Sequence, residues 1–119
     1  MLRSADKIYV SESKISGRGV FAKEDIKAGE ILEECHFIEL NEKDFNKIDT
    51  VLKEYVFTFP FGNKNNCVVF GLGSIYNHSL LPNAYWECDE NKKLFRYIAS
   101  KSIKKNDEIF INYQKWVDF

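Results

Sequence analysis

Short apolar runs separated by turn-forming residues are the feature that most constrains how this chain can fold. Runs of strand length recur along the sequence, and Gly, Pro, Asn or Asp stand between many of them. We expect strands at residues 7–11, 30–40, 56–59, 67–70, 84–88, 93–99 and 108–113. Only the stretch from Asn41 to Val56 has apolar residues near helical spacing, with Asn41 placed to cap a helix. The pattern predicts a mainly β fold of short strands and small sheets with one short helix.

The length and charge narrow the class of protein further. A chain of 119 residues has the size of one domain, and we expect residues 1–119 to form a single one. The formal net charge of -1 argues against a dedicated nucleic-acid binder, which would need excess Lys and Arg to meet phosphates. The stretch from Glu30 to Glu54 is acidic, with eight acids against three lysines. It is either a solvated face or a strip that attracts a basic peptide.

Cysteine usage and hydropathy bear on the compartment. Cys35, Cys67 and Cys88 are odd in number and lack the spacing of a disulfide framework or a zinc site. No apolar run approaches the ~20 residues of a membrane span, and the start of the chain lacks the apolar stretch of a secretory signal. We expect an intracellular, soluble protein with reduced thiols, no metal and no membrane contact.

The first of three notable blocks is Gly17-Arg18-Gly19-Val20-Phe21-Ala22. Its G-x-G-x-x-A spacing formally fits the dinucleotide fingerprint, but that motif needs an apolar strand before it and a helix after it. Here Ser13 to Ser16 precede the block and Gly29 soon follows it, so the fingerprint reading fails. The alternative is a hairpin turn in which Gly17 and Gly19 supply positive φ.

The second block is Asn77-His78-Ser79 followed by Pro82-Asn83, and the third is Glu108 to Tyr113. Metal or triad chemistry at His78 would need partners, and the chain has only two His and no His or Cys pair at ligand spacing. From the residues alone, His78 is a structural histidine and Asn77 makes turn hydrogen bonds. The third block is, on the same basis, an edge strand that ends in a buried Tyr113.

In this order, the three blocks resemble a SET-domain protein lysine methyltransferase, because Asn77-His78-Ser79-x-x-Pro82-Asn83 matches the family's N-H-S-x-x-P-N signature. The similarity extends from about Lys7 to Tyr113 and is greatest to the minimal, stand-alone SET proteins of large DNA viruses. It implies a β-roll with a C-terminal pseudoknot-like crossing. It also implies a single SET domain over residues 1–119 without a zinc-binding segment before or after it.

The resemblance also implies a set of site residues. S-adenosylmethionine would be the cofactor, and Tyr113 and Tyr55 would be the catalytic residues. The expected cofactor contacts are Ser16, Gly17, Arg18, Gly19, Asn77, His78 and Tyr113. The expected substrate channel is lined by Tyr55, Tyr76 and Trp116.

The chemistry of methyl transfer explains why such a site suits a tyrosine. A lysine amine must lose its proton before it attacks a methyl group, and its reference pKa is about 10.4. Burial in an apolar channel beside a positive sulfonium lowers that pKa, and water can carry the proton away. No dedicated base is then required, and Tyr113 would align the amine.

The function implied by the resemblance is methylation of a lysine in a basic peptide, most simply a histone tail in the nucleus or a host nucleus. A homodimer would supply cover for the site. Two alternatives stay open: a non-catalytic SET-fold module that binds a peptide or partner, and a methyltransferase of a non-histone protein. The first alternative is motivated by Gln114, which stands where the family often has Gly or Asn.

Overall fold

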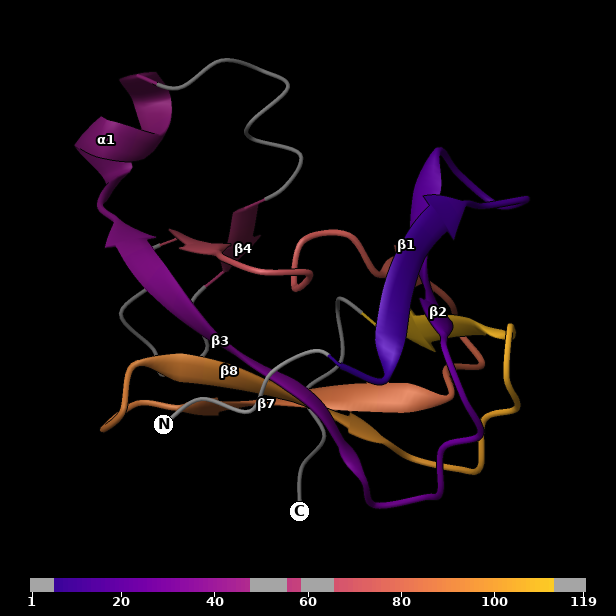
Figure 1. Ribbon diagram of the computed structural model, residues 1–119. Helices are drawn as coiled ribbons and strands as arrows, with labels where there is room; N and C mark the ends of the chain where they lie inside the picture. The colour runs from indigo at the N-terminus through magenta and orange to yellow at the C-terminus, as the bar shows by residue number, and fades with distance from the viewer. Residues whose placement is uncertain (1–5, 48–55, 59–65, 113–119) are drawn as a thin grey trace.

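The computed structural model describes residues 6–47, 56–58 and 66–112, and these ranges contain nine strands and one short helix (Figure 1). The elements are β1 (Ile8–Glu12), β2 (Arg18–Ala22), β3 (Ile31–Leu40), α1 (Glu42–Lys47), β4 (Val56–Thr58), β5 (Asn66–Val69), β6 (Asn77–His78), β7 (Ala84–Asp89), β8 (Leu94–Ala99) and β9 (Glu108–Ile111). The mainly β prediction is confirmed. No helix among the described residues is long and apolar enough to cross a membrane.

The strands form two sheets. One has the order β1-β2-β9-β6 and the other the order β4-β5-β3-β8-β7. Neighbouring strands are antiparallel except β6 and β9, which run parallel. The ten-residue strand β3 is the centre of the larger sheet and crosses the molecule diagonally in Figure 1. Strand β9 lies between β2 and β6, so it pairs with Asn77 and His78 and is not the edge strand expected from its sequence. The residues that would complete the expected pseudoknot-like crossing, 113–119, lie outside the described part of the chain.

Most of the expected strands and the helix cap are present. The backbone N–H of Asp44 donates to Asn41 Oδ1 at 2.8 Å, which confirms Asn41 as the N-cap of α1. The helix spans six described residues, and β4 begins at Val56. The part of the predicted helix at residues 48–55 falls outside the described ranges.

Two strands were missed, the two-residue β6 at Asn77–His78 and the longer β2. We expected a turn around Gly17 and Gly19, but Arg18 to Ala22 form β2, which pairs along its whole length with β1. Gly17 does adopt a positive φ of 46°, as expected, whereas the φ of Gly19 is not positive. Gly is a poor strand former, so the two glycines concealed β2, and the pairing of β2 with β1 on one side and β9 on the other overrides that propensity.

A single hydrophobic cluster joins the two sheets. Val20, Ile109 and Ile111 of the smaller sheet and Leu32 and Phe95 of the larger one belong to it and are essentially inaccessible to solvent. Burial of each such side chain contributes about 1.5–3 kcal/mol relative to exposure. The alternation of Ile109 and Ile111 with Glu108 and Phe110 therefore fixes which face of β9 meets the core and which faces the loops of the candidate site.

A buried acid lies within this core. Glu33 of β3 is 3% exposed, and its Oε1 accepts a hydrogen bond from the Tyr76 hydroxyl at 2.9 Å. The Tyr76 ring stacks on Tyr97 with centroids 4.7 Å apart. Burial raises the pKa of the Glu33 carboxyl and also that of the Tyr76 phenol. The contact ties the larger sheet to the segment that leads into β6.

Candidate active site

The three blocks of the sequence become neighbours in the smaller sheet. Val20 of β2 pairs with Ile109 of β9, and Phe21 pairs with Glu108. On the other side of β9, Asn77 pairs with Phe110 and His78 with Ile111. The Ser79 N–H continues this contact by donating to the Ile111 carbonyl at 2.9 Å. The glycine block, the Asn-His block and the C-terminal block therefore meet at one edge of the molecule.

The Asn77 side chain links the second block to the first. Its amide Nδ2 donates to the carbonyl oxygens of Ser16 and Arg18, each at 3.2 Å, and to Glu108 Oε2 at 2.8 Å. An amide NH₂ has two hydrogens, so three acceptors around it mean that one hydrogen is shared. Asn77 thus holds the turn at residues 16–18 against β6 and β9. The residue type predicted hydrogen bonds within a local turn, whereas the observed partners Ser16 and Arg18 lie 61 and 59 residues away in the sequence.

Asn83 explains the second half of the N-H-S-x-x-P-N motif. Its Nδ2 donates to the Glu108 carbonyl at 2.9 Å, and its Oδ1 accepts the Phe110 N–H at 2.8 Å. The Asn83 side chain therefore bonds to the backbone of β9 as a neighbouring strand would. The two asparagines of the motif fasten different partners: Asn77 holds the glycine turn and Asn83 holds β9.

Glu108 is a residue of this region that sequence reasoning did not single out. Its Oε1 accepts from the Ser13 hydroxyl at 2.7 Å, and its Oε2 accepts from Asn77. A Cβ added at Gly19 would lie 2.3 Å from Glu108 Oε2, so Gly19 is needed for close approach and not for an unusual φ. The available signal was the alternation of β9, which turns Glu108 away from the core that Ile109 enters.

The turn at residues 16–18 has room beside it for a ligand. Gly17 has a φ of 46°, and a Cβ built on it meets no atom within 4 Å. Arg18 is exposed, and His78 is half-buried at the adjacent strand. The turn thus presents an unobstructed backbone at Gly17 next to the Arg18 guanidinium, which would suit the carboxylate of a cofactor such as S-adenosylmethionine.

The expected channel and catalytic residues divide into two groups. Tyr55, Tyr113 and Trp116 lie outside the described residues, and their roles stay predictions. Tyr76 is fully buried in the core, and its hydroxyl donates a hydrogen bond to Glu33. Its role in the channel also stays a prediction. Asn112, the residue before Tyr113, is held by a hydrogen bond from Trp86 Nε1 to its carbonyl at 3.2 Å.

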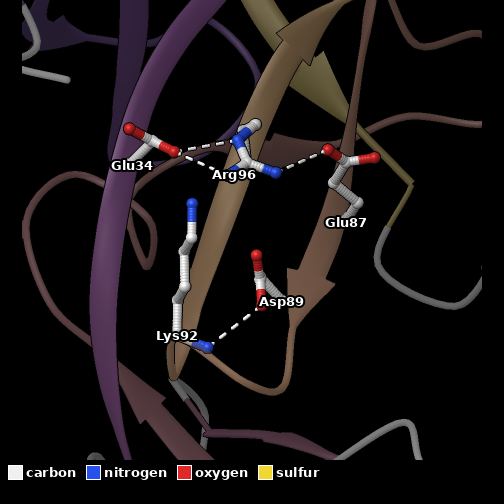
Figure 2. A network of polar contacts seen from close by, with 5 residues as sticks. All are labelled: Glu34, Glu87, Asp89, Lys92 and Arg96. Carbon is white, nitrogen blue, oxygen red and sulfur yellow. Dashed lines mark hydrogen bonds and ion pairs between the residues drawn. The ribbon is translucent and has the colours of Figure 1, made fainter. Parts of the chain in front are cut away.

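Three acids of the acidic stretch, Glu30, Glu34 and Glu39, form ion pairs within the fold. Figure 2 shows Arg96 of β8 between Glu34 of β3 and Glu87 of β7, with N–O distances of 2.8 Å and 2.9 Å. At the end of the same hairpin, the Lys92 N–H donates to Asp89 Oδ1 at 3.0 Å and closes the turn (Figure 2).

Other acids of the stretch are also paired. Glu30 lies 2.6 Å from Lys7 and Glu39 lies 3.5 Å from Lys93, while Glu33 is buried. The Lys7 ammonium and the Lys27 N–H hold the pKa of Glu30 below its usual value. These ion pairs offset part of the negative charge of the stretch, and its role in attracting a basic peptide stays a prediction.

The described residues include no candidate metal cluster, and their three cysteines are free thiols. Within residues 6–47, 56–58 and 66–112, no group of three or more His, Cys, Asp and Glu is arranged to hold a metal ion. Cys35, Cys67 and Cys88 are free thiols. Burial raises the pKa of Cys67 and Cys88 to about 12, so both stay protonated and weakly nucleophilic near neutrality.

Comparison with known proteins gives consistent results. The SET domain family model matches residues 17–114. A Schizosaccharomyces pombe histone-lysine N-methyltransferase specific for H3 lysine-37 is 34% identical over 115 residues, which cover 95% of this chain and 76% of that protein. The mouse protein-lysine N-trimethyltransferase SMYD5 is 32% identical over 84 residues, 66% of this chain, but the matched part is only 20% of SMYD5.

Solved structures agree with the sequence relatives. A crystal structure of a Plasmodium falciparum protein named for histone methyltransferase activity superposes with a TM-score of 0.75 at 35% identity, covering 92% of this chain and 96% of that one. A Polycomb Repressive Complex 2 chain of Chaetomium thermophilum has a TM-score of 0.77 at 22% identity, covering 93% of this chain and 15% of the larger one. The second likeness concerns the fold alone. The matched family model, the relatives and the three blocks joined at β9 together show that this chain belongs to the SET-domain family.

Proposed function

We propose that this chain is an S-adenosylmethionine-dependent protein lysine N-methyltransferase that acts on a histone tail in the nucleus. The observation that carries the proposal is the junction of the three blocks at β9, where Asn77 fastens the glycine turn beside the strand that leads to Tyr113. The relative specific for H3 lysine-37 spans nearly the whole chain and makes the histone H3 tail the first substrate to test.

The residues proposed to hold the cofactor are those of the turn Ser16 to Gly19 together with Asn77, His78 and Tyr113. The open space beside Gly17 leaves room for a ligand to approach the backbone of the turn. The exposed Arg18 suits a carboxylate by its charge. His78 would pack and orient the ligand and would transfer no proton. S-adenosylmethionine, when bound, supplies a methyl group on a positively charged sulfur.

The protein's own contribution is to prepare and align the lysine amine. An apolar channel disfavours the ammonium form, so the amine gives its proton to water on entry. The Tyr113 hydroxyl then accepts or donates a hydrogen bond that points the amine's lone pair at the methyl group. The Trp86 to Asn112 hydrogen bond fixes the backbone just before Tyr113. Tyr55 is the proposed second tyrosine of the channel.

A transfer assay tests the proposal. The purified chain is incubated with labelled S-adenosylmethionine and with free H3, H3 tail peptides or nucleosomes, and the modified lysine is located by mass spectrometry. We expect label on a lysine of the H3 tail with the wild type and its loss with Tyr113→Phe, with Tyr9→Phe as the matched control. Tyr9 is a suitable control because it lies on β1 and its hydroxyl bonds to Asn106.

The same samples separate the alternative functions. Calorimetry that detects no binding of S-adenosylmethionine or of its demethylated product would support a non-catalytic binding module. Binding without transfer to H3, but with label on other proteins of a nuclear extract, would support a non-histone substrate. Sedimentation of the active sample checks the expected homodimer.

A further inference from the structure

We propose that Glu108 is a positioning residue that fixes the turn at residues 16–19, and that it does so through its two hydrogen bonds and not through its charge. The inference rests on the proposed function in one respect: it takes the turn at residues 16–19 to be where the cofactor binds. Glu108 itself contacts the turn and Asn77, and no contact with the lysine substrate is invoked.

The two oxygens of the Glu108 carboxylate serve different partners. Oε1 accepts from Ser13, which begins the turn and whose backbone N–H donates to the Gly17 carbonyl at 2.9 Å. Oε2 accepts from Asn77, which in turn donates to the carbonyls of Ser16 and Arg18. One carboxylate therefore anchors the turn at its start directly and at its end through Asn77.

The rest of the fold makes room for this carboxylate and supports it. Gly19 lies so close that any side chain there would overlap Oε2. The Glu108 backbone is held without help from its side chain, because Asn83 donates a hydrogen bond to the Glu108 carbonyl and Phe21 of β2 is the strand-pairing partner of Glu108. Removal of the side chain should therefore leave β9 in place and loosen only the turn and Asn77.

A loosened turn affects binding in a predictable way. A site that is ordered only part of the time has a higher apparent Kd, which equals the intrinsic Kd divided by the fraction of time in which the site is competent. For Glu108→Ala we expect the Kd for the demethylated cofactor to rise about tenfold, as for a turn that is competent about a tenth of the time. We expect the KM for the peptide to stay unchanged, because the partners of the carboxylate, Ser13 and Asn77, hold the turn proposed to bind the cofactor.

Glu108→Gln separates hydrogen bonding from charge. The glutamine amide oxygen can accept from Asn77, and its NH₂ can donate to the Ser13 hydroxyl, which can act as acceptor or donor. Both links survive while the negative charge is lost. We therefore expect Glu108→Gln to bind the cofactor within about twofold of the wild type. Asp107→Ala is the matched control, since it removes the exposed acid that directly precedes Glu108 in the chain.

The experiment combines calorimetry with NMR of the Asn77 side-chain amide in the ligand-free protein. The expected result is weak binding and a displaced, broadened Asn77 signal in Glu108→Ala, with near-normal binding and signal in Glu108→Gln and Asp107→Ala. Ser13→Ala removes one of the two hydrogen bonds to Glu108, so its Kd should lie between those of the wild type and Glu108→Ala. It replaces Glu108→Ala in the experiment if that variant does not fold.

Two outcomes would overturn the inference. If Glu108→Gln weakened cofactor binding as much as Glu108→Ala does, the effect would come from the lost charge. If Glu108→Ala bound the cofactor as the wild type does, Glu108 would have no role in cofactor positioning. Failure of the proposed function looks different, because the wild type itself would then bind no cofactor while the Asn77 signal still responded to Glu108→Ala.

Discussion

Gly19→Ala is the substitution that most sharply tests the contact between the glycine block and the C-terminal block. The new Cβ would lie 2.3 Å from Glu108 Oε2, 2.9 Å from Glu108 Cδ and 3.0 Å from Asn77 Nδ2. Gly19 has no positive φ, so alanine adopts its backbone without strain. The carboxylate is the end of a flexible side chain and can move away. The cost of the substitution is therefore the loss of the hydrogen bonds from Ser13 and Asn77, not a fixed clash.

The magnitude follows from those two bonds. Each hydrogen bond to a charged group contributes about 1.5–3 kcal/mol, and Glu108 is half-buried, so rehydration of the displaced carboxylate brings the sum to the low end, about 3 kcal/mol. Replacing Gly by Ala lowers the entropy of the unfolded chain and returns about 0.4–1 kcal/mol. We expect a net loss of about 2 kcal/mol in the free energy of unfolding, or roughly 8 °C in Tm for a chain of this size.

Chemical unfolding of four proteins provides the assay: the wild type, Gly19→Ala, Glu108→Ala and the double variant. If the cost arises from displacement of the carboxylate, Gly19→Ala is nearly neutral when residue 108 is already alanine. An equal cost of Gly19→Ala in both backgrounds would refute the reasoning. Gly17→Ala is the matched control, because its Cβ meets open space and its φ of 46° costs an L-residue only about 1 kcal/mol.

Three further substitutions test other parts of the account. Trp86→Phe keeps a ring beside Phe95 but removes the hydrogen bond to the Asn112 carbonyl, so we expect kcat to fall about tenfold while unfolding assays show a loss of only about 1 kcal/mol. Arg96→Met leaves two partly buried carboxylates without their shared partner and should cost about 2 kcal/mol in urea unfolding, against under about 0.5 kcal/mol for Lys93→Met at an exposed pair. Burial raises the pKa of Glu33 in the folded state, so the folded protein holds this proton more tightly than the unfolded chain does. The stabilising effect of that proton is complete below the reference value of 4.5 and is lost as the pH rises through the raised pKa. Glu33→Gln should remove this contribution, which is measured as the difference between the two unfolding curves over a pH series.

Sequence patterns predicted the parts of the fold that depend on local chemistry. The strands β3, β5, β7, β8 and β9 follow from their apolar and β-branched runs, and the helix start follows from the Asn41 side chain. The strand β2 could not be predicted the same way, since Gly17 and Gly19 indicate a turn. Its extended form depends on hydrogen bonds from β1 and β9, which are distant in the sequence.

The site could be predicted in its members but not in its connections. The motif indicated Asn77 and His78, yet nothing local shows that Asn77 reaches the Ser16 carbonyl or that Asn83 bonds to β9. Glu108 was overlooked because an acid at the start of a strand is ordinary, and its partner Ser13 lies 95 residues away. The ion pairs that the acidic stretch makes with Lys7 and Arg96 were hidden for the same reason, because they form only on folding.

The central claim is that the three blocks joined at β9 form a site that transfers methyl groups to lysine. The most direct test is mass spectrometry of histone H3 after incubation with the wild-type protein and isotopically labelled S-adenosylmethionine. The account predicts labelled methyl groups on a lysine side chain of the H3 tail and none with Tyr113→Phe. Unmodified H3 and an unmodified nuclear extract, from a sample that calorimetry shows to bind the cofactor, would contradict it.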